Sequence, residues 1–106
     1  MITVLKSKIQ EAVIVGASVE CEGSITLSPE LMAKANLREY EQVHVNSKYG
    51  KGRIITYVLE GEKGQGVELN GGAANHFKLN EVVHILSFRT ENEQRFEEGY
   101  YKPTIC

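Results

Sequence analysis

Short stretches in which apolar residues alternate with polar ones recur along the chain, and this period of two predicts strands. The alternating or β-branched stretches lie at residues 2–4, 12–15, 23–27, 40–46, 53–59, 67–69 and 82–88. Turn-forming residues separate most of them, as at 47–52 and 60–66. Many short strands with frequent turns are typical of a small β-barrel, so we expect a mainly β fold.

The run Ala12-Val13-Ile14-Val15 is continuously apolar rather than alternating. A continuous run predicts a strand that is buried on both faces, either inside a closed barrel or beneath a contact between subunits. Gly16-Ala17-Ser18 follows this run and predicts a turn.

The clearest helix start in the sequence is Ser28-Pro29-Glu30. Serine caps the first turn, proline suits the first helical position, and the glutamate complements the helix dipole. We expect this helix to end near Asn36 after about two turns and to depend on the sheet for support. One more helical turn is expected within residues 73–77. Beyond Thr90 the polar sequence predicts an arm or a loose tail.

Composition and charge limit the domain number, the binding partners, the disulfides and the metal sites that we expect. The 106 residues form one expected domain without a linker, and 42% of them are apolar. The formal net charge of -2 does not favour nucleic acid or an anionic membrane, and no apolar run is long enough to span a bilayer. With only Cys21 and Cys106, a disulfide framework is not expected, and a reducing cytoplasm fits. The three histidines lack the spacing of metal ligands, so no metal is expected.

Gly23 precedes Ser24 at the start of an expected strand, and the peptide bond between them is a candidate for a self-cleavage reaction. Glycine lets other groups approach its carbonyl closely. The Ser24 hydroxyl can attack that carbonyl where the backbone is strained and the resulting oxyanion is stabilised. Most Gly-Ser pairs are simply turns, so the residues alone favour that ordinary interpretation.

The sequence resembles the pyruvoyl-dependent aspartate 1-decarboxylases from Met1 to about Phe88, with similar spacing throughout. Each piece of the resemblance is weak alone, but their order and spacing together are specific. The pieces are Lys8 within Lys-Ser-Lys-Ile, Glu22-Gly23-Ser24, Arg53-Ile54-Ile55-Thr56-Tyr57 and Asn70-Gly71-Gly72-Ala73-Ala74.

The resemblance implies a double-psi β-barrel with one or two short helices, assembled as a homotetramer with active sites between subunits. It also implies self-cleavage between Gly23 and Ser24, which yields chain 1–23 and chain 24–106. The second chain would begin with a pyruvoyl group made from Ser24, the only cofactor expected. A substrate amine would form a Schiff base with this group, which would accept the electrons released with carbon dioxide.

The resemblance also implies roles for individual residues. Tyr57 would donate the proton, because a phenol stays neutral near pH 7 until it reacts. Arg53 and Lys8 would bind the substrate carboxylates, and Thr56 would donate to the Gly23 carbonyl during cleavage. Three further residues, Asn70, Gly72 and Ala73, would line the site.

Without the resemblance, each of these residues has an ordinary explanation. Arg53 and Tyr57 share one face of their strand, where such pairs are commonly cross-strand contacts. Thr56 faces the opposite side, so it reaches the same site as Tyr57 only through a bend or a neighbouring subunit. Lys8 is ordinarily explained as a solvated surface charge, and Asn70-Gly71 as a common hairpin turn, so neither requires a catalytic role.

Two positions depart from the family pattern and leave the substrate open. Cys21 stands where the family usually has a carboxylate-binding tyrosine, and Gln10 stands where it often has histidine. Cysteine leaves a larger pocket with a weaker hydrogen-bonding group, and glutamine does not exchange protons near pH 7.

We therefore expect a decarboxylase for a small acidic amino acid, with conversion of L-aspartate to β-alanine in pantothenate supply as the first choice. One alternative is a relative that acts on a different amino acid. Another is an unprocessed barrel that acts as a binding or regulatory module. The sequence leaves open whether cleavage is spontaneous or assisted by a maturation partner.

Overall fold

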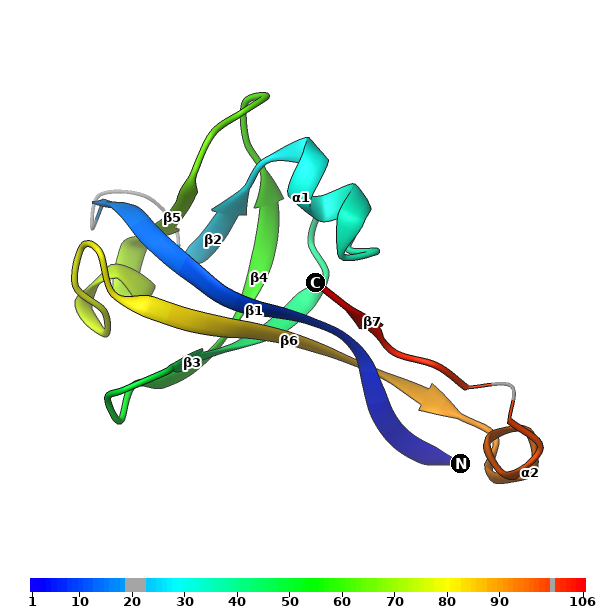
Figure 1. The fold of residues 1–106 in the computed structure, drawn as a ribbon. Helices are drawn as coiled ribbons and strands as arrows, with labels where there is room; N and C mark the ends of the chain where they lie inside the picture. Colours follow the sequence, from blue (N-terminus) through cyan, green and yellow to red (C-terminus); the bar gives the residue numbers. More distant parts are fainter. Residues whose placement is uncertain (19–22, 100) are drawn as a thin grey trace.

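The strands of the described chain form one sheet that closes on itself (Figure 1). The computed structural model describes residues 1–18, 23–99 and 101–106. Its strands are β1 (Ile2–Ser18), β2 (Ser24–Leu27), β3 (Gln42–Ser47), β4 (Arg53–Glu60), β5 (Val67–Asn70), β6 (Val82–Glu91) and β7 (Thr104–Ile105). Its helices are α1 (Pro29–Lys34), the 3-10 helix η1 (Gly71–Asn75) and α2 (Glu93–Glu97).

Barrel closure depends on the short strand β5. The strand order is β5-β2-β4-β3-β6-β1-β7, and β5 also pairs with β1. This additional pairing closes six strands of the described chain into a barrel and leaves β7 outside it. The predicted fold, mainly β with a small barrel and short helices, is confirmed.

Alternate side chains of the barrel strands fill its interior. In β3, Val43 and Val45 have no exposed surface, whereas His44 between them is partly exposed. The other fully or almost fully buried core side chains are Ile14, Ile25, Leu27, Val58, Leu69, Val83 and Ile85. The period of two in the sequence therefore corresponds to inward and outward faces of one closed sheet.

β1 is a single long strand interrupted by two irregularities. Its pairing with β6 shifts between Leu5 and Ser7 and again between Ile9 and Ala12. Glu11, within the second shift, has a φ of 56° in the left-handed region. Such irregularities bend a strand and increase its twist. The first part of β1 and the outer end of β6 consequently extend from the barrel as an arm (Figure 1).

The turn predicted at residues 16–18 is wrong, because these residues continue β1. Gly16, Ala17 and Ser18 pair with residues 68–70 of β5 in the contact that closes the barrel. A Cβ atom on Gly16 would lie 2.5 Å from the Glu68 carboxylate. Glycine at this position therefore provides room for a neighbouring side chain rather than a reversal of the chain.

The run at residues 12–15 is buried on only one face within a single chain. Ile14 has no exposed surface, whereas 42% of Val13 and 54% of Val15 is exposed. The expectation that the closed barrel buries both faces is therefore wrong. Burial of the outer valines beneath a subunit contact remains a prediction.

α1 begins as the sequence predicts. The Ser28 hydroxyl accepts a hydrogen bond from the Leu31 amide at 3.2 Å, and Pro29 and Glu30 occupy the first turn. The helix ends at Lys34, and Asn36 follows with a φ of 57°. In the described part of the chain, neither α-helix has the length and apolar character that crossing a membrane requires.

The C-terminal segment is an ordered arm rather than a loose tail. α2 lies at the far end of the arm, and β7 returns along β1 to the barrel (Figure 1). The Tyr101 hydroxyl donates to the Leu5 carbonyl at 2.5 Å. The Cys106 amide donates to the Lys8 carbonyl at 3.0 Å, and the Gln10 amide donates to the Cys106 carbonyl at 2.8 Å.

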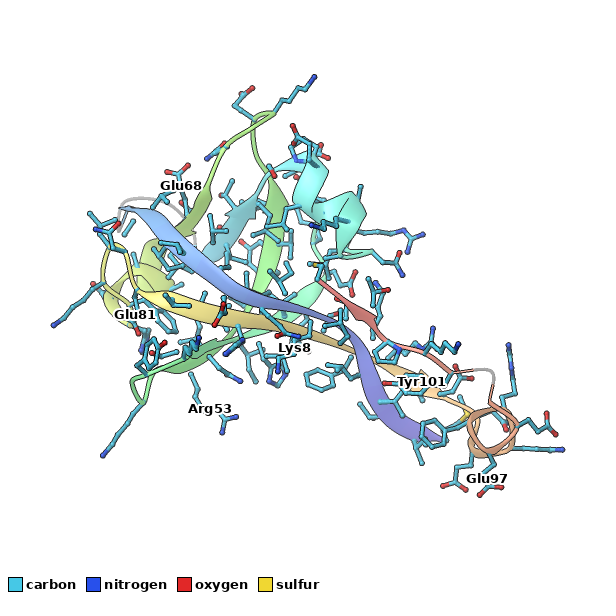
Figure 2. The ribbon with its side chains drawn as sticks, in the orientation of Figure 1. Lys8, Arg53, Glu68, Glu81, Glu97 and Tyr101 are labelled. Atoms are coloured by element: carbon cyan, nitrogen blue, oxygen red, sulfur yellow. The ribbon has the colours of Figure 1, made fainter. Side chains whose placement is uncertain are left out.

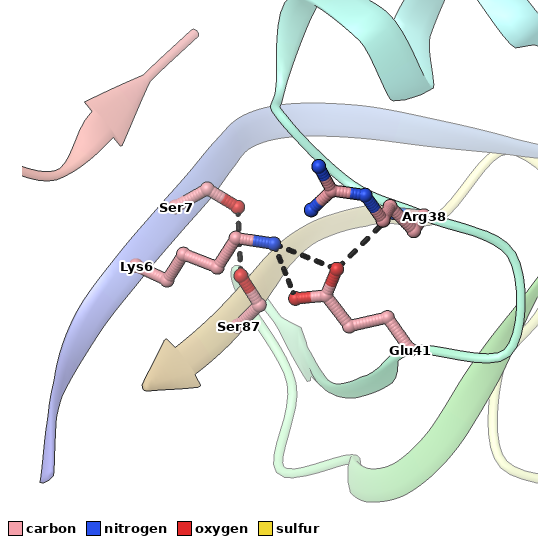
Figure 3. A network of polar contacts seen from close by, with 5 residues as sticks. All are labelled: Lys6, Ser7, Arg38, Glu41 and Ser87. Atoms are coloured by element: carbon pink, nitrogen blue, oxygen red, sulfur yellow. Dashed lines mark hydrogen bonds and ion pairs between the residues drawn. The ribbon is translucent and has the colours of Figure 1, made fainter. Parts of the chain in front are cut away.

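Polar contacts attach β1 to its neighbours near the base of the arm (Figure 3). Lys6 Nζ donates to both carboxylate oxygens of Glu41, at 2.7 and 2.8 Å, and the Arg38 amide donates to the same carboxylate. The hydroxyls of Ser7 and Ser87 share a hydrogen bond of 2.9 Å and are both buried. Each buried hydroxyl thus has a hydrogen-bond partner although neither is in contact with water.

We predict that Leu69→Ala lowers the free energy of unfolding by about 2–5 kcal/mol, because it opens a cavity in the strand that closes the barrel. Urea unfolding at one fixed protein concentration, followed by circular dichroism, measures this change. Leu79→Ala is the matched control, since Leu79 is 58% exposed and its loss should change stability by less than about 0.5 kcal/mol. Equal effects of the two substitutions would contradict the importance of this strand.

Candidate active site

Ser24 is the first residue of β2 and has no exposed surface. It lies opposite Asn70 in the antiparallel pairing of β2 with β5. Asn70 Nδ2 donates to Ser24 Oγ at 2.9 Å and also to Thr26 Oγ1 at 2.8 Å. The structure therefore brings together two residues that the sequence assigned to one site, through a direct contact between their side chains.

Thr26 is a residue of this cluster that the sequence analysis missed. Its hydroxyl accepts the second hydrogen bond of the Asn70 amide and so helps to hold that amide in position. The signal was present, because alternation along residues 24–27 directs Ser24 and Thr26 to the same face.

Gly23 lines a hollow of about 200 Å³, which we call the Gly23 hollow. Its lining residues are Gly23, Ile54, Ile55, Thr56, Ala73 and His76. Thr56 and Ala73 were predicted to belong to the site, whereas His76 was not. A Cβ atom built on Gly23 would lie 3.9 Å from the Gly72 amide, so Gly72 is also close.

Two larger hollows continue along β4 from this point. The middle hollow, of about 380 Å³, is lined by His44, Asn46, Arg53, Ile54 and Ile55. The His84 hollow, of about 390 Å³, is lined by Asn46, Ser47, Gly50, Lys51, Gly52, Arg53 and His84. Each hollow shares two residues with the next. The three hollows therefore lie near one another along β4, from Thr56 to Arg53.

The pairing of β4 explains the position of the Gly23 hollow. β3 pairs with Arg53 to Tyr57, whereas over the described residues β2 pairs with β4 only from Val58 to Glu60. The N-terminal half of β4 therefore has β3 along one edge and the Gly23 hollow beside the other, whereas residues of β3 line both larger hollows. Binding sites often occupy such a gap, because a small molecule can approach the backbone there.

Lys8 and Arg53 lie on the same outer face of the sheet. Lys8 pairs with Leu86, which pairs with His44, which pairs with Ile55, and directly paired residues share a face. Arg53 lies two positions from Ile55 on β4 and therefore points the same way. In Figure 2, Arg53 projects away from the barrel on this side of the sheet.

Tyr57 and Thr56 occupy opposite faces of β4, as their alternation predicts. Thr56 pairs with the fully buried Val43, and Tyr57 pairs with the exposed Gln42. Tyr57 is not among the described residues that line the Gly23 hollow. A single chain therefore brings Thr56, but not Tyr57, to the hollow beside the cleavage position.

Of the two positions that depart from the family pattern, the structure describes Gln10 but not Cys21. Gln10 is exposed on β1 beside the C-terminal residue, and it lines none of the hollows described above. Cys21 lies outside the described residues. Among the described side chains, no group of three histidine, cysteine, aspartate or glutamate residues could hold a metal ion.

His84 is the second functional candidate that the sequence analysis missed. It lies on β6 between the buried Val83 and Ile85, and it lines the hollow named after it. Its Nδ1 atom is buried and has no hydrogen-bond partner among the described residues. Burial lowers the pKa of His84 below its ordinary value, and the positive charges of Lys8 and Lys48 lower it further.

The chain is similar to known proteins along most of its length. A family model described as aspartate decarboxylase matches residues 1–106. A Stenotrophomonas maltophilia protein named aspartate 1-decarboxylase is 36% identical over 105 residues, which cover 98% of this chain and 82% of the relative. A Dehalococcoides mccartyi protein of the same name is 45% identical over 91 residues, which cover 85% of this chain and 73% of the relative.

We predict that Lys8→Met raises the pKa of His84 towards its ordinary value of about 6.5, because it removes a neighbouring positive charge. A pH titration of the histidine ring protons by NMR measures the change, and the loss of one signal in His84→Asn assigns the resonance. Lys34→Met is the matched control, since it removes the same charge at the end of α1. An unchanged His84 titration in the Lys8 variant would show that the two side chains do not interact.

Proposed function

This chain belongs to the aspartate decarboxylase family, and from that premise we propose that it converts L-aspartate into β-alanine and carbon dioxide with a pyruvoyl group made from Ser24. The observation that carries the proposal is the contact between Asn70 and the buried Ser24 hydroxyl, directly after a glycine that lines a hollow. These are the parts that a self-cleaving Gly-Ser bond requires. The chain contains a serine oxygen held in place, a carbonyl without a neighbouring side chain and space beside it.

In the proposed cleavage, Ser24 Oγ attacks the Gly23 carbonyl carbon, and an ester replaces the amide. Elimination then breaks the bond between Cβ and Oγ of residue 24, and Gly23 leaves as the carboxylate that ends chain 1–23. Water hydrolyses the remaining dehydroalanine, releases ammonia and leaves the ketone at the start of chain 24–106. The hydrogen bond from Asn70 supports this route, because it fixes the position of the attacking oxygen.

Thr56 is the proposed donor to the oxyanion that forms on the Gly23 carbonyl. Its presence in the lining of the Gly23 hollow supports this role. A hydroxyl already directed at the position where negative charge develops stabilises the transition state without reorganisation.

The pyruvoyl ketone supplies an electron sink for the pair released with carbon dioxide. Arg53 and Lys8 bind the substrate carboxylates in this proposal, and their shared outer face supports that role. Asn70, Gly72 and Ala73 border the reacting position, and the two small residues leave room for the substrate. Tyr57 holds the proton that is returned to the carbon from which carbon dioxide departs.

We further propose a homotetramer in which a neighbouring subunit completes each active site. Tyr57 is not among the described residues that line its own chain's Gly23 hollow, which supports a second chain bringing this acid to the reacting carbon. The exposed apolar side chains Val13, Val15 and Ile55 support a contact between copies.

The proposed cellular location is the cytoplasm, which the content of only two cysteines supports.

We predict that purified wild-type protein contains two fragments separated between Gly23 and Ser24, and that Ser24→Ala remains a single chain of about 11.8 kDa. Alanine has no oxygen with which to attack the carbonyl. Intact-mass spectrometry distinguishes these states. Ser28→Ala is the matched control and should still cleave, since it removes only a helix cap. An uncleaved wild-type chain without decarboxylase activity would favour the binding or regulatory alternative.

We predict that Tyr57→Phe cleaves normally but forms β-alanine about 100-fold or more slowly, because it lacks the acidic hydroxyl. Amine product formed per cleaved chain is the measurement, repeated over several amino acids to test a different substrate. Tyr49→Phe is the matched control, since Tyr49 is 82% exposed in the β3–β4 hairpin. Full turnover by the Tyr57 variant would assign the proton to another residue.

A further inference from the structure

The His84 hollow is lined by positively charged and neutral polar groups. Lys51 and Arg53 supply two permanent positive charges, and no described carboxylate lines it. Asn46 Oδ1 accepts from Arg53 Nε at 3.4 Å, and this contact does not use the terminal guanidinium nitrogens. A hollow with this composition suits an anion, and a planar carboxylate suits the forked guanidinium.

The nearby carboxylates are already engaged. Glu81, just before β6, accepts from the Ser47 hydroxyl at 2.5 Å and from the Lys78 amide at 3.0 Å. These bonds lower the pKa of Glu81 and keep it ionised. Glu11 forms an ion pair with Lys48. Neither interaction neutralises Arg53.

His84 faces this hollow from the opposite side to Arg53. Asn46 pairs with Arg53 on one side and with His84 on the other, so the three side chains form one row across the sheet. A buried ring nitrogen that donates to nothing is costly to retain, and such a group usually has a partner. The described chain provides none for His84 Nδ1, whereas the hollow has space for one.

We propose that His84 is a third carboxylate-binding residue, which donates its Nδ1–H to the side-chain carboxylate of the substrate while Arg53 binds the same group. This inference rests on the proposed function, since that function provides a substrate with two carboxylates. The middle hollow shares lining residues with both the His84 hollow and the Gly23 hollow.

The charges around His84 define how binding affects it. Lys8 from β1 and Lys48 from the β3–β4 hairpin oppose its protonation. Lys51 and Arg53 line the same hollow, and Glu81 is bonded to Ser47, which also lines it. A bound carboxylate adds negative charge against the ring and favours a proton on Nδ1. Substrate binding is thus expected to raise the affinity of His84 for a proton.

Kinetics of the cleaved protein test the role directly. We predict that His84→Leu raises KM for aspartate about tenfold or more, with kcat changed less than about threefold, because it removes a donor to a charged group. His84→Asn should keep KM within about threefold of wild type, since its amide nitrogen lies near the former Nδ1 position. Equal KM values for wild type and His84→Leu would overturn the proposal. A general loss of structure would impair both variants and reduce the yield of cleaved chains.

A binding measurement keeps this inference separate from the proposed function. Succinate carries two carboxylates but no amine, so it can occupy the site without reacting. NMR titration should show that succinate raises the pKa of His84 and that propionate does so more weakly. An unchanged His84 resonance at saturating succinate would overturn the proposal, as would a stronger response to phosphate than to succinate. If wild type fails to decarboxylate aspartate but succinate still raises the pKa of His84, the proposed reaction is contradicted while the proposed carboxylate site is supported.

Discussion

The pairing of β5 with both β1 and β2 is the constraint on which the rest of the molecule depends. This four-residue strand closes the barrel on one side and carries Asn70 to Ser24 on the other. Its buried Leu69 fixes which face points inward, because a shift of one residue would exchange the two faces. Asn70 therefore reaches the serine hydroxyl only in the register that also buries the core. The proposed chemistry at the Gly-Ser bond thus depends on the same pairing as the stability of the fold.

The two halves of β4 differ in how many neighbouring strands they pair with. Its C-terminal half is paired on both edges and contributes Val58 to the core, whereas its N-terminal half is paired with β3 alone over the described residues. The second edge of this half borders the Gly23 hollow. A barrel built from uniformly paired strands would have little room there. Incomplete pairing of one strand consequently leaves space for a small ligand without opening the core.

The outer face of the sheet concentrates positive charge although the whole chain carries a formal charge of -2. Lys8 and Arg53 come from strands far apart in the sequence, and His84 lies in the same region on β6. Local charge rather than net charge decides what such a surface attracts. The buried histidine nitrogen without a described partner and the positive groups beside it are what support the proposed carboxylate site.

The sequence by itself determined the mainly β architecture and the capped helix at Ser28, and its resemblance to a known family singled out the Gly23-Ser24 pair as a candidate. Each of these follows from residues close together in the chain, through strand alternation, helix capping and a recognisable set of short motifs. Only the tertiary structure decided that Gly16 continues a strand, that Asn70 and Thr26 share one hydrogen-bonded cluster with Ser24, and that His84 faces Arg53. Those outcomes depend on which strands become neighbours and in which register. Pairing between distant segments is a property of the closed barrel, and no local pattern of residues specifies it.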